Sequence, residues 1–225
     1  MCTRFVYNGK ETIVGFNFDI DLSEWEHTVI TEKDRFFIGI KMSDNKYHSF
    51  HGINRNGNVG TLLYVHGNDN AQFCGNESCY TIADLTENFI KGNLSFDDSL
   101  EIVKKKKITM QAMFSDRNGR VLIIEPGIGY RLEKEKYSLI TNYSILKPEL
   151  TNPYVLSGDN RYEKAKDLLQ GYGENFSISN AFDVLRSVRQ EGLWATRVSL
   201  VYSVAKNKVY YVLNNDFKNI AEYQF

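Results

Sequence analysis

The sequence predicts an α+β fold in which helices cover antiparallel sheets. Three observations support this prediction. Strand-like and helix-like segments occur in blocks, short hairpin turns join many of the strand-like segments, and 225 residues with 42% apolar side chains can bury a sizeable core. No linker, repeat or low-complexity segment divides the chain, so we expect a single domain over residues 1–225.

The first 65 residues carry short segments rich in β-branched and aromatic side chains, which favour strands. Turn sequences such as Asn8-Gly9 and Asn56-Gly57 separate them and are short enough for hairpins. We therefore predict an antiparallel meander. Its strands cover residues 3–7, 12–21, 35–42, 47–53 and 59–65.

A helical period replaces the strand pattern over residues 81–104. Apolar residues recur at helical spacing on both sides of Gly92-Asn93, which predicts two short helices. Four lysines follow at residues 104–107. Because cations are favoured at the negative end of the helix dipole, we interpret these lysines as a solvated helix end rather than a nucleic-acid patch.

The rest of the chain repeats the order of strands and then helices. Residues 147–160 have the composition of a loop. Strands are predicted at 108–114, 121–126 and 137–141, helices at 161–169 and 179–190, and closing strands at 197–205, 209–213 and 220–225. Blocks of this kind, with few signals of parallel crossovers, indicate antiparallel sheets with helices outside.

Composition argues against several classes of protein. Lys and Arg number 27 and Asp and Glu 28, so a net charge of −1 provides no field that would attract nucleic acid. No apolar run approaches the roughly 20 residues of a membrane span, and no secretory leader precedes the first strand. Three cysteines are an odd count, which suits a reducing compartment. We expect a cytoplasmic protein without nucleic-acid or membrane partners.

The histidines and the remaining cysteines do not show metal-ligand spacing. His48, His51 and His66 have no cysteine or carboxylate at the required intervals. Cys74 and Cys79 lack a second pair, and a disulfide between them would require export. The sequence therefore indicates no metal site and no cofactor.

Cys2 is the strongest candidate for catalysis. A small residue at position 2 permits removal of the initiator methionine, which would place a thiol and a free α-amine on one residue. An α-amine has a pKa of roughly 7.7 to 8.0, so it can accept the thiol proton near neutral pH. Such a residue contains both the nucleophile and its base, and no histidine is needed.

Short motifs follow one another from end to end of the chain. The first is Met1-Cys2-Thr3-Arg4-Phe5 with residues 15–19, and the others cover residues 52–57 with 62–64, 139–142, 157–162, and 201–203 with 208–211. In this order they resemble the N-terminal-nucleophile cysteine amidases, the family of choloylglycine (bile salt) hydrolase and penicillin V acylase. The resemblance implies a four-layer αββα sandwich and cleavage of a linear amide.

The resemblance also implies roles for individual residues. Cys2 would attack the amide carbonyl, and Asp19 would hold the α-amine through a charge-assisted hydrogen bond. Asn142 would donate to the oxyanion together with a backbone N–H near Tyr64. Arg161 would lower the pKa of the Cys2 thiol. Apart from the resemblance, Asp19 is better explained as a strand-end acid that is solvated or caps a turn, and Asn142 has an ordinary explanation as a loop residue. Arg161 could be a surface residue of a helix's first turn, but the helix dipole disfavours arginine there and so favours a function.

One departure from the family lies beside the expected nucleophile. Phe16 stands where the family has an arginine, and Arg4 is our candidate to replace that cation. Cys2 and Arg4 are two residues apart on one predicted strand, and Asn17 lies on the next strand. From this period of two we expect Arg4 and Asn17 to share the face of Cys2 and to contact substrate.

These observations predict a hydrolase that cleaves the linear amide C–N bond of an N-acyl small molecule through a thioester on Cys2. Tyr64 matches penicillin V acylases, whereas bile salt hydrolases have asparagine there. Aromatic residues such as Trp25 suit an apolar acyl group. An acyltransferase of the same fold and an inactive small-molecule-binding homologue remain open, as does homo-oligomerisation, because the connection between Asn142 and Arg161 is short for the family.

Overall fold

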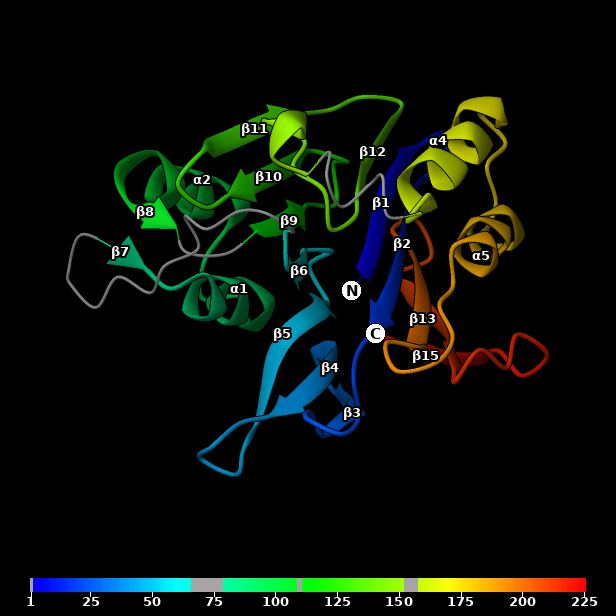
Figure 1. Ribbon diagram of the computed structural model, residues 1–225, viewed down its shortest axis with the longest axis horizontal. Coiled ribbons are helices and arrows are strands. Elements are labelled where there is room, and N and C mark those ends of the chain that lie inside the picture. The colour runs from blue at the N-terminus through cyan, green and yellow to red at the C-terminus, as the bar shows by residue number, and fades with distance from the viewer. Residues whose placement is uncertain (1, 66–78, 109–110, 152–157) are drawn as a thin grey trace.

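The computed structural model describes residues 2–65, 79–108, 111–151 and 158–225. Two sheets pack face to face around a shared apolar core, and helices cover the outer face of each sheet (Figure 1). The protein is therefore a four-layer αββα sandwich of the α+β class, which confirms the predicted fold.

The six-stranded sheet contains the start of the chain. In order across the sheet, its strands are β12 (Tyr137–Ile140), β1 (Cys2–Asn8), β2 (Thr12–Asp19), β13 (Thr196–Ser203), β14 (Lys208–Leu213) and β15 (Ala221–Gln224). All neighbouring strands in it are antiparallel. Cys2 opens β1 opposite Phe18, and Asp19 ends β2 opposite Thr196. The first residues of β1 and the last residues of β2 therefore lie at the same end of the sheet.

The seven-stranded sheet faces it and is also antiparallel. Its strands in order are β11 (Gly129–Glu133), β10 (Val121–Glu125), β9 (Gln111–Ser115), β6 (Val59–Leu63), β5 (Tyr47–Asn54), β4 (Arg35–Lys41) and β3 (His27–Glu32). Two short strands, β7 (Cys79–Tyr80) and β8 (Lys107–Ile108), form a separate parallel pair.

Among the described residues, each outer layer contains a pair of helices with an apolar face against its sheet. Helices α1 (Ile82–Lys91) and α2 (Phe96–Lys105) cover the seven-stranded sheet, and α4 (Arg161–Gly171) and α5 (Ile178–Ser187) cover the six-stranded sheet. Gly92, with φ of 78°, ends α1 in the left-handed conformation that glycine adopts most easily. A short 3-10 turn, Pro148–Leu150, interrupts the predicted loop.

Strand β1 shows how the sequence positions its side chains. Cys2 and Val6 face the core between the sheets, whereas Phe5 and Tyr7 face α4 and α5. Because alternate residues of a strand point to opposite faces, Arg4 also faces the opposite sheet. Strand β1 therefore lies between two apolar clusters, and Arg4 is a buried charged residue on the face that packs against the opposite sheet.

The predicted elements differ from the structure mainly at the edges of the seven-stranded sheet. Strands β3 and β11 were not expected, and both are edge strands with mostly exposed or half-buried side chains. Such strands bury no complete face and therefore lack the apolar alternation on which the prediction depends. Within the described part of the chain, the helices fall short of the length and apolar content that a bilayer crossing needs.

Candidate active site

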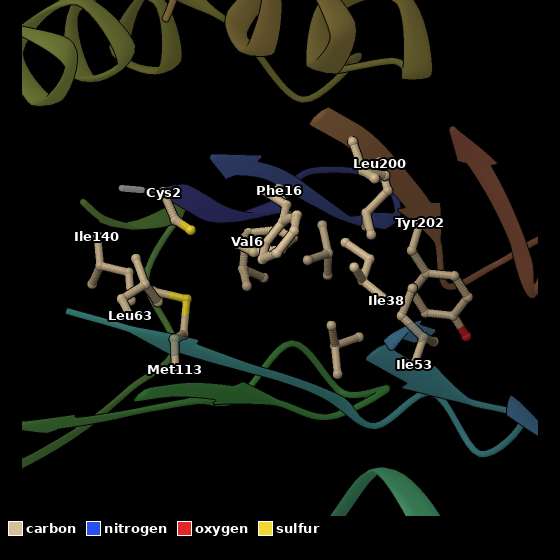
Figure 2. Packing of buried hydrophobic residues seen from close by; sticks show 14 of the residues in the cluster. Cys2, Val6, Phe16, Ile38, Ile53, Leu63, Met113, Ile140, Leu200 and Tyr202 are labelled. Atoms are coloured by element: carbon tan, nitrogen blue, oxygen red, sulfur yellow. The ribbon is translucent and has the colours of Figure 1, made fainter. Parts of the chain in front are cut away.

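The Cys2 side chain lies at one end of the core between the sheets. Its sulfur points into that core, whose cluster of buried residues includes Leu63 and Ile140 (Figure 2). The residue is 7% exposed. Burial raises the pKa of the Cys2 thiol, and the negative charge of Asp19 adds to this effect, whereas a hydrogen bond from the Asp19 backbone and the charge of Arg161 act against it. The thiol is therefore protonated at neutral pH and needs a base.

Asn142 connects the backbone of Cys2 to two other segments. The Cys2 nitrogen donates to Oδ1 of Asn142 at 2.8 Å, and Arg161 Nη2 donates to the same oxygen at 3.1 Å. The Asn142 Nδ2 donates to the carbonyl oxygen of Tyr64 at 2.5 Å. Because Oδ1 accepts from two donors and Nδ2 donates to one acceptor, the orientation of the Asn142 side-chain amide is fixed. One Nδ2 proton is then left for a further acceptor.

Arg161 is the central cation of the site and opens α4. It makes a bidentate contact with Asp159, with Nε at 2.9 Å and Nη2 at 2.6 Å from the carboxylate. Its Nη1 lies 3.3 Å from the Cys2 carbonyl oxygen and 3.4 Å from Asp19 Oδ2. Burial opposes the charged form, but the two carboxylates raise the pKa of Arg161 overall. The guanidinium thus remains charged and holds the start of β1 against the end of β2.

Asp19 is a buried carboxylate at the end of β2. It accepts hydrogen bonds from Thr196 Oγ1 at 2.6 Å and from Gln190 Nε2 at 2.9 Å. Burial raises the pKa of Asp19 to about 6, although these donors and Arg161 favour the ionised form. Asp19 consequently changes charge within the range of pH in which most enzymes work.

The structure brings four of the predicted residues together and separates two others. Cys2, Asp19, Asn142 and Arg161 form one network with the Tyr64 carbonyl. The Tyr64 side chain is 58% exposed rather than part of the core. The backbone N–H proposed near it as a second oxyanion donor stays a prediction.

Asn17 does not share the face of Cys2, contrary to our expectation. It pairs with Thr3, and directly opposite residues of adjacent strands point to the same side. Because Thr3 and Cys2 are consecutive, Asn17 lies on the helix side, where it donates to the Leu185 carbonyl at 2.8 Å and accepts from Ser199 at 2.7 Å. These partners make Asn17 an anchor for α5.

Arg4 shares the face of Cys2 but does not join the network. Its guanidinium crosses the core and donates to groups of the opposite sheet, Thr61 at 2.8 Å and Ser115 at 2.7 Å among them. The structure therefore does not place Arg4 among the groups around the Cys2 backbone.

Three residues of the network were missed. Asp159 lies two residues before Arg161 in a predicted motif, and an aspartate just before a helix start could have been recognised as its partner. Thr196 and Gln190 give no local signal, because they reach Asp19 only through the long-range pairing of β2 with β13.

The residues considered for metal binding have other surroundings. His48 contacts Asp44 and Glu87, and His51 is buried, with its ring stacked 5.2 Å from that of Phe16. Among the residues that the structure describes, His, Cys, Asp and Glu form no group of three that could hold a metal ion. His66 and Cys74 lie outside these residues, as does the side chain of Cys79.

Comparison with known proteins shows the relationship in structure rather than in sequence. No protein-family model matches the chain, and no curated protein is similar enough in sequence to be found. The structure is similar to penicillin V acylase from Agrobacterium tumefaciens, with a TM-score of 0.70 and 16% identity over 100% of this chain and 86% of that one.

Two further solved structures have the same fold. A mutant conjugated bile acid hydrolase from Clostridium perfringens gives a TM-score of 0.64 and 13% identity, covering 100% of this chain and 92% of that one. An N-acylethanolamine-hydrolyzing acid amidase ortholog from Caenorhabditis elegans gives a TM-score of 0.62 and 16% identity. The match covers 90% of this chain and 93% of that one. The predicted resemblance is confirmed at the level of structure: the chain has the N-terminal-nucleophile hydrolase fold of penicillin V acylase and conjugated bile acid hydrolase.

Proposed function

We propose that this protein is an amide hydrolase whose nucleophile is Cys2, made N-terminal by removal of what precedes it. The observation that carries the proposal is the network that surrounds the Cys2 backbone. Its nitrogen is bound by Asn142 and its carbonyl by Arg161, which also contacts Asp19. A fold that binds both ends of one residue with buried polar groups holds that residue in a single orientation, as covalent catalysis requires.

In the proposed first step the α-amine of Cys2 accepts the thiol proton while the sulfur bonds to the amide carbonyl carbon. Asn142 stabilises the oxyanion with its remaining Nδ2 proton. The C–N bond then breaks, and the α-ammonium gives its proton to the departing amine. The product of this step is a thioester between Cys2 and the acyl group.

Water completes the reaction in the second step. The α-amine accepts a proton from the water as its oxygen bonds to the thioester carbon, and the C–S bond then breaks with return of the proton to the sulfur. Asp19 and Arg161 remain in place through both steps. The carboxylate of Asp19 favours the ammonium form of the Cys2 nitrogen, so its ionisation supports the base at neutral pH.

The surface next to the Cys2 network suits a substrate with an apolar acyl group, like the substrates of penicillin V acylases. The loops next to Asp19 and Thr196 carry large exposed apolar side chains, and so does Tyr64, whose backbone carbonyl accepts from Asn142. The loops are adjacent, because the Ile20 N–H donates to the Ala195 carbonyl. The exposed side chains are Leu22, Trp25, Tyr64, Leu193 and Trp194.

Two experiments test the nucleophile. A variant with Cys74→Ala and Cys79→Ala keeps Cys2 as its only thiol, so iodoacetamide labelling followed by intact mass reports on Cys2 alone. We expect loss of the preceding residue, rapid labelling, and hydrolysis of N-acyl substrates that disappears in Cys2→Ser. Hydrolysis that survives Cys2→Ser would refute the proposed nucleophile, and an uncleaved start with an unreactive thiol would favour the inactive binding homologue that Phe16 suggests.

The acyltransferase alternative differs only in the second step. Adding hydroxylamine to the reaction traps the thioester as a hydroxamate in either case. A hydrolase releases free acid in water alone, whereas a transferase releases little acid until an acceptor amine is added. The ratio of acid to hydroxamate therefore separates the two.

A further inference from the structure

Glu125 is a buried carboxylate that the proposed mechanism leaves unused. It ends β10 and is 1% exposed. Its Oε2 accepts from Ser144 Oγ at 2.5 Å, and its Oε1 accepts from the backbone nitrogens of Ile145 at 2.5 Å and Leu146 at 3.2 Å. Burying a carboxylate costs free energy unless donors satisfy it, so these three hydrogen bonds hold Glu125 and the segment that supplies them together.

The donors to Glu125 belong to a segment, residues 142–146, that begins with the proposed oxyanion donor Asn142. Three neighbouring strands of the seven-stranded sheet, β6, β9 and β10, have one end beside this segment (Figure 1). Leu63, which ends β6, pairs with Gln111, which opens β9. The residue before Glu125 pairs with the residue after Gln111. One end of the sheet therefore presents Leu63, Gln111 and Glu125 in a row.

Each of these strands holds a different part of the segment. The carbonyl of Tyr64, which directly follows β6, accepts from Asn142 Nδ2 at 2.5 Å. Gln111 Nε2 donates to the Tyr143 carbonyl at 3.3 Å, and Glu125 binds the three residues that follow. The chain after Asn142 is thus fixed to the seven-stranded sheet, whereas Oδ1 of Asn142 accepts from the first residues of β1 and α4.

We propose that Glu125 and Gln111 are positioning residues for Asn142, which hold the backbone after it so that its remaining Nδ2 proton is directed at the oxyanion. This role rests on the proposed function, in which Asn142 is the oxyanion donor. A donor stabilises the transition state only where the charge develops, and a displacement of about 1 Å can cost about 10²-fold in rate. Both residues are 1% exposed, so they act on the reaction through Asn142 rather than by contact with substrate.

The first measurement is a double-mutant cycle on kcat for an N-acyl substrate. Glu125→Met removes the acceptor of three donors and should lower kcat about 10- to 100-fold, with KM within about threefold of the parent. Glu125→Gln keeps an oxygen for both backbone N–H groups and should keep most of the kcat. In an Asn142→Ala background, Glu125→Met should lower kcat no more than about twofold, because the group that Glu125 positions is gone.

The second measurement needs no turnover. In ¹⁵N-labelled protein, the side-chain amide signal of Asn142 is identified by its loss in Asn142→Ala. We expect this signal to move or broaden in Glu125→Met and in Gln111→Met, because each removes a hydrogen bond of the segment. Ile124→Ala removes packing on the helix side of the same strand and is the control for a loss of stability alone. It should change neither the Asn142 signal nor kcat.

An unchanged kcat in Glu125→Met overturns the proposal, and so does a loss that is equally large in the Asn142→Ala background, in Glu125→Gln or in Ile124→Ala. An Asn142 signal that stays in place in both methionine variants also overturns it. If Glu125→Met does not fold, Gln111→Met decides: a kcat loss that disappears without Asn142 supports the proposal, and an unchanged kcat overturns it. If the parent hydrolyses no amide, the proposed function is rejected, and the Asn142 signal alone supports or overturns the positioning.

Discussion

The buried carboxylate of Asp19 makes the stability of the fold depend on pH in a direction that can be predicted. Burial moves the pKa of Asp19 from 3.8 to about 6. The folded state therefore holds this proton more tightly than the unfolded chain does, and the stability that the group contributes is complete below about pH 3.8 and lost as the pH rises through about 6. A difference of about two pKa units corresponds to roughly 3 kcal/mol.

Asp19→Asn isolates this contribution. Urea unfolding of the variant and the parent between pH 3.5 and 8 gives the difference in their free energies of unfolding. The contributions of all other titrating groups are the same in both proteins and cancel in this difference. We expect this difference to shift in favour of the variant by roughly 3 kcal/mol as the pH rises. A mismatch between the Asn amide and the donors Thr196 and Gln190 adds a constant that does not alter the slope.

Asp98 provides a control of opposite sign. Its pKa is lowered by the hydrogen bonds of the Ser95 cap, so it adds stability above the unfolded pKa and loses it as the pH falls. As the pH rises through the lower part of the range, the difference in free energy of unfolding between Asp98→Asn and the parent should therefore shift against the variant. If the Asp19→Asn difference stays constant within about 0.5 kcal/mol, the carboxylate is not destabilised by burial and the electrostatic reasoning for the site is wrong.

Four other outcomes follow from the same contacts. If the proposed function is right, the kcat/KM of the wild-type protein for an N-acyl substrate should decline as the pH falls through about 6, because protonated Asp19 no longer supports the ammonium. Arg161→Lys should not restore the activity lost in Arg161→Gln, since one ammonium cannot reproduce the forked contact, and a fully active lysine variant would contradict this. Asn142→Ala should lower kcat about 10²- to 10³-fold with little change in KM, and a change confined to KM would exclude the oxyanion role. Gly15→Ala would place a Cβ 2.2 Å from the Phe5 ring, so urea unfolding should show a loss of about 1–3 kcal/mol, and unchanged stability would mean that the ring can move freely.

Local sequence signals predicted the layers of the fold well, because the buried elements carry their own periodicity. Helix α2 has a capping box at Ser95 and Asp98, followed by buried Leu100 and Val103 at helical spacing. Strand β1 alternates between two apolar environments. The edge strands could not be predicted in this way, since β11 has mostly exposed side chains and gains its structure only by pairing with β10.

The candidate site depends on register, which a sequence pattern does not provide. The period of two correctly placed Arg4 on the face of Cys2, but it gave no information on how β1 aligns with β2. The observed pairing of Cys2 with Phe18 places Asn17 on the other face. Motifs taken from a resemblance located Asn142 and Arg161, whose contacts with Cys2 span 140 and 159 residues of chain and leave no local trace.

The cation missing at Phe16 is better understood from the strand pair to which this residue belongs. Phe16 lies directly opposite Arg4, and its ring stacks on His51. Burial lowers the pKa of His51 to about 3, so the imidazole cannot become a second cation in this layer. The positive charge expected on β2 is therefore present on β1, directly across the pair, and the aromatic ring at position 16 fills the space beside it. On this reasoning Phe16 alone does not indicate an inactive protein, because the strand that begins with Cys2 still carries a buried arginine on the same face.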